Sequence, residues 1–129
     1  MTTNQAVVIL KPGREKSVRR HHPWIFSGAI DRASPALSAG ETVRVLSADG
    51  TPLALGSVSP QSQIRVRVWT FDPAEEITPP FFAYRLNRAL QSRQLLQAGD
   101  TLSALRLVNA ESDGLPGLIV DRYEDYLVC

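Results

Sequence analysis

A cluster of basic side chains near the N-terminus is the strongest chemical signal in this 129-residue chain. Such a cluster attracts phosphate groups because binding releases counterions, and an arginine can also hold one phosphate through two hydrogen bonds. The candidate phosphate-binding residues are Lys11, Arg14, Lys16, Arg19 and Arg20, with His21 directly after them. The ordinary alternative for a run of charges is a solvated helix face.

Two arginines on a later segment extend the basic surface. Residues 63–69 alternate apolar and polar side chains, so Arg65 and Arg67 share one face of a predicted strand and are weaker phosphate-binding candidates. Trp24 and Phe26 have the ring faces on which a base can stack. We expect these two aromatic residues to fill the core instead, as most large apolar side chains do.

The remaining reactive residues predict neither a catalytic site nor a metal site. His21 and His22 have no pair of cysteines with which to complete a zinc site. Glu111 and Asp113 have the spacing of an acid/base pair, but the Asp-Gly and Pro-Gly sequences beside them favour an ordinary turn. Nothing around Cys129 indicates an activated thiol. We therefore assign no catalytic, metal-binding or cofactor-binding residue.

Composition and charge distribution exclude several classes of protein. The first 32 residues carry six Lys or Arg against two Asp or Glu, although the whole chain has a net charge of only +1. No apolar stretch approaches the roughly 20 residues of a membrane span, and no signal peptide is recognisable. A single cysteine excludes a disulfide framework. We expect a cytoplasmic protein that does not interact with membranes.

The first half of the chain predicts a small β-barrel. Residues 6–10 have the pattern of a buried strand, and residues 14–20 that of a short basic helix. Residues 41–46 and 52–58 form a predicted hairpin around Asp49-Gly50, and residues 63–69 form the clearest strand. Four or five short strands with one helix predict a compact, mostly antiparallel barrel over residues 5–71.

A second domain is expected after a proline-rich boundary. Residues 72–80 contain three prolines and three acidic residues and are the predicted linker. Residues 81–97 have helical spacing, with a stop predicted at 98–100, and strands are predicted at 105–108, 118–123 and 126–129. The fold class is therefore α+β, with a partial α/β domain over residues 81–129. Because the last predicted strand is cut short, we expect a fragment of a longer protein.

Three separated stretches carry a resemblance to a known family. They are residues 10–30 (LKPGREKSVRRHHPWIFSGAI), 63–69 (QIRVRVW) and 106–123 (RLVNAESDGLPGLIVDRY). In this order and spacing they resemble the start of the bacterial ribosomal RNA large-subunit methyltransferase I family. Members of that family are S-adenosylmethionine-dependent cytosine-C5 RNA methyltransferases.

The resemblance implies a fold for each part of the chain and places RNA binding and catalysis in different domains. Residues 5–71 would form a PUA domain, a pseudo-barrel that binds RNA, and residues 81–129 would begin the central α/β domain. In the family, a cysteine attacks C6 of the target cytosine, and S-adenosylmethionine methylates C5. Both groups belong to a Rossmann-like domain that this chain lacks. The chain alone is therefore expected to bind no cofactor and to be inactive, and Cys129 is not expected to be the nucleophile.

The implied partner is structured RNA, expected to be ribosomal, and a homodimer is left open. The basic residues named above would capture that RNA. The alternative is a structural or protein-interaction module that docks a catalytic domain or a second subunit. Apolar strand edges such as residues 126–128 would then make the contact.

Overall fold

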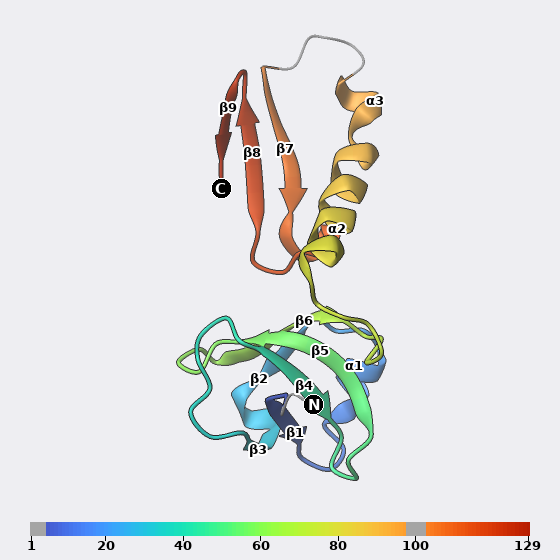
Figure 1. The fold of residues 1–129 in the computed structure, drawn as a ribbon, viewed down its shortest axis with the longest axis vertical. Helices are drawn as coiled ribbons and strands as arrows, with labels where there is room; N and C mark the ends of the chain where they lie inside the picture. Colours follow the sequence, from blue (N-terminus) through green and yellow to red (C-terminus); the bar gives the residue numbers. More distant parts are fainter. Residues whose placement is uncertain (1–4, 98–102) are drawn as a thin grey trace. The chain divides into compact units, whose positions relative to one another are not determined.

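The computed structural model describes residues 5–97 and 103–129 and divides the chain into two compact units, Met1–Ile77 and Thr78–Cys129 (Figure 1). The first unit contains a curled six-stranded sheet in the order β2-β6-β5-β4-β1-β3. Its strands are β1 (Val7–Leu10), β2 (Trp24–Phe26), β3 (Ile30–Ala33), β4 (Thr42–Leu46), β5 (Pro52–Val58) and β6 (Ile64–Thr70). Helix α1 (Glu15–Arg19) and the 3₁₀ turn η1 (Ser27–Ala29) flank β2 in the sequence.

Alternating side chains build the core of this unit. Along β6, Val66 and Val68 are buried, while Arg65 and Arg67 are half-buried on the opposite face. Valines and leucines from β1, β4 and β5 complete the same core, and Val18 attaches α1 to it. The first unit is therefore a curled, mostly antiparallel sheet around one core, as predicted, and every pairing in this sheet is antiparallel except that of β1 with β4.

Two sequence expectations for this unit were wrong. The sheet has six strands rather than four or five, because Ile30–Ala33 forms a strand in which only Ile30 is even half-buried. The residue of β2 that enters the core is Ile25, whereas Phe26 is 48% exposed and Trp24 is half-buried. Side chains alternate along a strand, so burial of Ile25 turns both of its neighbours outward.

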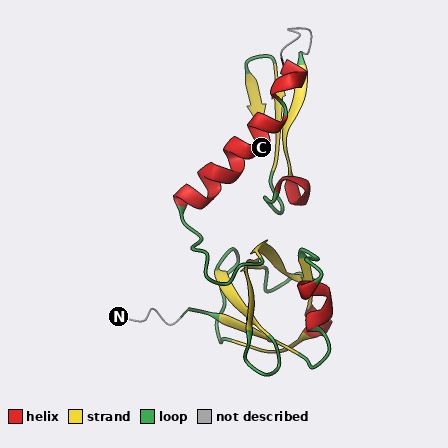
Figure 2. Cartoon of the chain, turned by 90° about the vertical axis from the view of Figure 1, so that its right-hand side faces the viewer, coloured by secondary structure: helices red, strands yellow, loops and turns green. Residues whose placement is uncertain are grey.

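The second unit is a three-stranded antiparallel sheet packed against a helix (Figure 2). Its elements are α2 (Pro79–Ser92), α3 (Gln94–Gln97), β7 (Ala104–Asn109), η2 (Ala110–Asp113), β8 (Ile119–Tyr123) and β9 (Tyr126–Val128). Phe81 and Ala89 of α2 are buried together with Leu107, Val108 and Leu115. These positions are the compact core of the unit. None of the helices among the described residues has the length and apolar character needed to cross a bilayer.

The helix differs from the prediction at both ends. It begins at Pro79 rather than at residue 81, because the first turn of a helix tolerates prolines, whose missing N–H groups would have no partner there. It ends at Ser92, and Arg93 separates it from the short α3. The stop predicted at 98–100 lies outside the described residues.

Candidate functional site

A tight turn sets the start of α1, which carries Lys16 and Arg19 of the basic cluster and has Arg14 and Arg20 directly at its two ends. The Lys11 carbonyl accepts a hydrogen bond from the Arg14 N–H at 3.0 Å, and Gly13 has a φ of +83°, which glycine adopts without strain. Val18 is buried against the sheet. The helix is therefore held by its single apolar side chain, and its basic side chains, Lys16 and Arg19, are left exposed.

The end of α1 is a left-handed turn without glycine. His21 has a φ of 63°, and its N–H donates to the Val18 carbonyl at 2.9 Å, while the His22 N–H donates to the Ser17 carbonyl at 2.9 Å. These bonds satisfy carbonyls that the helix end would otherwise leave without a partner. The same turn stacks the His21 ring on Phe71, with centroids 4.4 Å apart and planes 13° from parallel.

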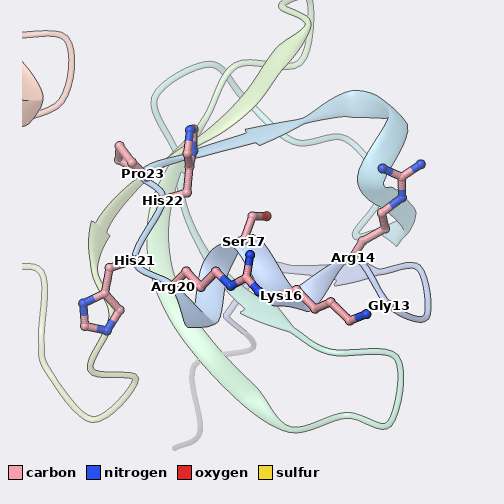
Figure 3. A pocket seen from close by; sticks show the side chains of 8 residues that line it. All are labelled: Gly13, Arg14, Lys16, Ser17, Arg20, His21, His22 and Pro23. Carbon is pink, nitrogen blue, oxygen red and sulfur yellow. The ribbon is translucent and has the colours of Figure 1, made fainter.

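A hollow of about 600 Å³ lies between α1 and the segment that leads into β2 (Figure 3). Its lining includes Arg14, Lys16, Ser17, Arg20, His21 and His22. Figure 3 shows the Lys16 and Arg20 side chains extending along α1 in one direction, whereas the His21 ring turns away from them. Four of the eight predicted binding residues therefore line one concave surface. We call it the α1 hollow.

A smaller hollow of about 180 Å³ adjoins it. Arg14 and Ser17 line both hollows, and the smaller one is completed by residues that include Trp24 and Phe26 of β2. Two adjoining hollows therefore share Arg14, one lined mainly by basic residues and the other by the aromatic residues of β2.

The three basic residues of the α1 hollow lack acidic partners in the described part of the chain. Ion pairs within residues 5–97 and 103–129 include Arg32–Asp31, Arg93–Asp113 and Arg106–Asp121. Arg14, Lys16 and Arg20 take part in none of these pairs, and all three are exposed. Unpaired cations around a concave surface attract anions, and a low local dielectric strengthens that attraction.

The other predicted binding residues lie outside the α1 hollow. Lys11 is exposed in the preceding turn, and Arg19 lines a different depression together with Phe71. Arg65 and Arg67 lie on the outer face of β6, where the Arg65 Nε donates to the Ser62 carbonyl at 3.0 Å. The predicted set is therefore spread over the α1 hollow, the outer face of β6, the turn before α1 and the depression beside Phe71.

Asp113 and His22, which were considered for acid/base and metal chemistry, form hydrogen bonds with neighbouring residues. Both carboxylate oxygens of Asp113 accept hydrogen bonds from Arg93, at 3.1 and 2.7 Å, and Oδ2 also accepts one from the Asn109 N–H at 2.6 Å. The Arg93 hydrogen bonds hold the pKa of Asp113 below its usual range, whereas a general acid would need a raised pKa. His22 Nδ1 accepts a hydrogen bond from the Trp24 N–H at 3.2 Å. No group of three potential metal ligands occurs among the described residues.

Comparison with known proteins defines the class of the first unit. Residues 8–71 match the family described as PUA-like domain. The whole chain is similar to proteins named ribosomal RNA large subunit methyltransferase I. That of Aliivibrio fischeri strain MJ11 is 52% identical over 122 residues, which is 95% of this chain and 31% of the relative. That of Photobacterium profundum is 54% identical over 130 residues, or 100% of this chain and 32% of the relative.

Solved structures show the same fold. A candidate SAM-dependent methyltransferase from Streptococcus mutans superimposes with a TM-score of 0.78 at 18% identity, over 94% of this chain and 31% of that one. A candidate methyltransferase complexed with SAH superimposes with the same TM-score, at 19% identity and the same coverage. Residues 8–71 therefore form a PUA-like domain, and the chain is a homologue of the proteins named ribosomal RNA large subunit methyltransferase I, of whose length it spans about a third.

Proposed function

We propose that this chain is the RNA-capturing part of an S-adenosylmethionine-dependent ribosomal RNA (cytosine-C5) methyltransferase, acting in the cytoplasm. The observation that carries the proposal is the α1 hollow, where Arg14, Lys16 and Arg20 have no acidic partner among the described residues. The phosphate groups of an RNA backbone are anions that would pair with these three basic side chains. The names of the relatives add ribosomal RNA as the substrate class.

The α1 hollow does not fit the methyl donor. A nucleoside cofactor in a Rossmann-like fold is held by a glycine-rich loop and an acidic residue on the ribose hydroxyls. The α1 hollow is lined by basic residues and contains no carboxylate. In the proposed whole enzyme, S-adenosylmethionine supplies the methyl group elsewhere, and the role of this chain is to hold the RNA.

The salt dependence of RNA binding tests the proposal. Binding of the chain to a ribosomal RNA hairpin would be measured by fluorescence anisotropy from about 50 to 200 mM salt. Each phosphate contact contributes about −0.7 to −0.9 to the slope of log K against log salt. Replacing Arg14, Lys16 and Arg20 together by alanine should weaken binding and make the slope shallower by about 2 to 3.

Arg32→Ala is the matched control. It also removes one positive charge from the first unit, but Arg32 lies on β3, at the opposite edge of the sheet from β2, and pairs with Asp31 at 3.6 Å. We expect binding to be nearly unchanged. The proposal fails if the chain binds no RNA, or if the triple variant has the same slope as Arg32→Ala.

One observation favours a second function. Strand β9 is an edge strand, and its Tyr126, Leu127 and Val128 are 75, 62 and 56% exposed. Such an edge can pair with another strand, as a docking module for a catalytic domain or a second copy would require. Stable self-association of the chain in size-exclusion chromatography, without affinity for RNA, would support this function over RNA capture.

A further inference from the structure

The outer side of β2 carries a row of aromatic rings, which we call the aromatic row: His22, Trp24 and Phe26. The ring centroids of His22 and Trp24 lie 6.1 Å apart at 73°, and those of Trp24 and Phe26 lie 6.5 Å apart at 84°. Ile25 between them is buried in the core, and Phe26 is 48% exposed. The row is therefore attached to the barrel by Ile25 and presents aromatic surface to solvent.

Two arginines of β6 lie opposite β2. Trp24 is the register partner of Arg67 across the β2–β6 pair, and residues directly opposite each other in an antiparallel pair point to the same side. Arg65 lies two positions along β6, at the register irregularity opposite Ile25 and Phe26, and its Nε donates to the Ser62 carbonyl at 3.0 Å. Both arginines are half-buried, and neither forms an ion pair within the described residues. Aromatic and guanidinium groups thus share one surface at the sheet edge.

The aromatic row also adjoins the α1 hollow. The smaller hollow has Arg14 on its α1 side and Trp24 and Phe26 on its β2 side. A nucleotide chain crossing from the α1 hollow onto the outer face of β2 would meet cations for its phosphates on both sides of the rings. Alternation of stacking rings and basic groups is typical of surfaces that bind single-stranded nucleic acid.

We propose that the aromatic row binds unpaired bases of the RNA by stacking, while Arg65 and Arg67 hold the phosphates beside them. This inference rests on the proposed function and narrows its ligand to single-stranded or looped RNA. In fully paired RNA the bases stay stacked within the helix, so none is free to stack on the aromatic row. Stacking on a ring face does not distinguish one base from another, so the row provides affinity for unpaired RNA with little sequence preference.

Phe26→Ala tests the inference, because Phe26 is largely exposed and its loss leaves the core intact. Binding would be measured to a single-stranded RNA oligonucleotide and to a blunt RNA duplex of the same length. Base stacking on an aromatic side chain corresponds to roughly 5- to 150-fold in affinity. We expect a loss in this range for the single strand, no change for the duplex, and the same salt slope as the unmodified chain.

Fluorescence provides a second readout that does not depend on folding of the Phe26 variant. In a Trp69→Phe background, Trp24 is the only tryptophan of the chain. We expect the single strand to quench Trp24 emission and the duplex to leave it unchanged. Tyr84→Ala is the matched control, since it removes an aromatic side chain that is 64% exposed on α2, and it should leave both affinities unchanged.

The outcomes separate this inference from the proposed function. Salt-dependent RNA binding that Phe26→Ala leaves intact, without quenching of Trp24, would overturn the inference and retain RNA capture. Equal quenching by the duplex would also overturn it. Absence of any RNA binding would refute both proposals. Binding of an extended peptide along the β2 edge, with no preference for unpaired RNA, would overturn the inference in favour of a protein ligand.

Discussion

Asp113 offers the sharpest test of how the second unit is held together. Its carboxylate joins the end of α2, through Arg93, to the turn after β7, through the Asn109 N–H. The Asp113 and Arg93 side chains are only 14% and 16% exposed. Asp113→Ala removes three hydrogen bonds and leaves the Arg93 guanidinium largely buried without its counter-ion.

The expected loss is large relative to the stability of so small a unit. Removing one partner of a buried ion pair costs about 3–5 kcal/mol. The unit has roughly fifty residues, for which a free energy of unfolding of about 3–8 kcal/mol is usual. We therefore expect Asp113→Ala to remove most of the stability of the second unit and to leave the first unit folded.

Native-state hydrogen exchange, followed by NMR, measures the stability of each of the two units separately. Amides of β7 and β8 should lose protection in Asp113→Ala, while amides of β5 and β6 provide an internal reference. Asp121→Ala is the control, because it breaks the more exposed pair with Arg106 and should cost less. Equal protection of β7 and β8 in the two variants would refute the view that the Arg93–Asp113 pair holds this unit.

The stability of the second unit should decrease as the pH falls. Hydrogen bonds from Arg93 hold the folded-state pKa of Asp113 below its ordinary value of 3.8. A carboxyl group with a depressed pKa stabilises the fold fully above its unfolded-state pKa, and this stabilisation is lost as the pH falls through the folded-state value. Protection of β7 should therefore decrease below about pH 4 in the unmodified chain. The decrease should be smaller in Asp113→Asn, which lacks this titration.

Three further substitutions test local packing. A Cβ at Gly56 would lie 2.6 Å from a backbone oxygen of β6, so Gly56→Ala should lower the free energy of unfolding of the first unit by roughly 1–3 kcal/mol, measured by urea unfolding, if the strand shifts to make room. Gly114 has a φ of +68°, and a Cβ there would lie 2.5 Å from Arg85 Nη1, so Gly114→Ala should cost about 1–2 kcal/mol in the second unit. Hydrogen bonds from Ser47 and Thr51 lower the pKa of Asp49 to about 2, so Asp49→Ala should speed exchange of the Thr51 N–H at neutral pH.

Sequence periodicity predicted the elements whose burial alternates. Strands β4 and β6 have buried side chains at every second position, whereas β5, with three consecutive buried residues, was predicted from the Asp49-Gly50 turn that pairs it with β4. Strand β3 could not be found in this way, because three of its four residues are exposed. Its existence depends on pairing with β1, which brings residues more than twenty positions apart into register.

The sequence predicted which residue types form the candidate site, but the tertiary structure determines which of them lie together. The basic character of α1 is visible in the sequence, but which of its cations share a hollow depends on the single buried side chain, Val18, that orients the helix. The outward orientation of Trp24 and Phe26 follows from burial of Ile25, which the alternation of a three-residue strand is too short to reveal. The break in the helix at Arg93 was also not predicted, and Arg93 there bonds to Asp113, twenty positions away in the sequence.

Several arginines of the second unit are bonded within that unit, whereas the cations of the α1 hollow have no acidic partner among the described residues, so net charge is a poor guide to the chain. In the second unit, Arg85 donates to the Gly114 carbonyl at 2.6 Å, and Arg93 and Arg106 are paired with carboxylates. These groups already have their partners and release few counterions on binding RNA. In the first unit, the cations of the α1 hollow have no such partners among the described residues. The salt dependence of RNA binding should therefore originate almost entirely in the first unit, and neutralising Arg106 should leave its slope unchanged.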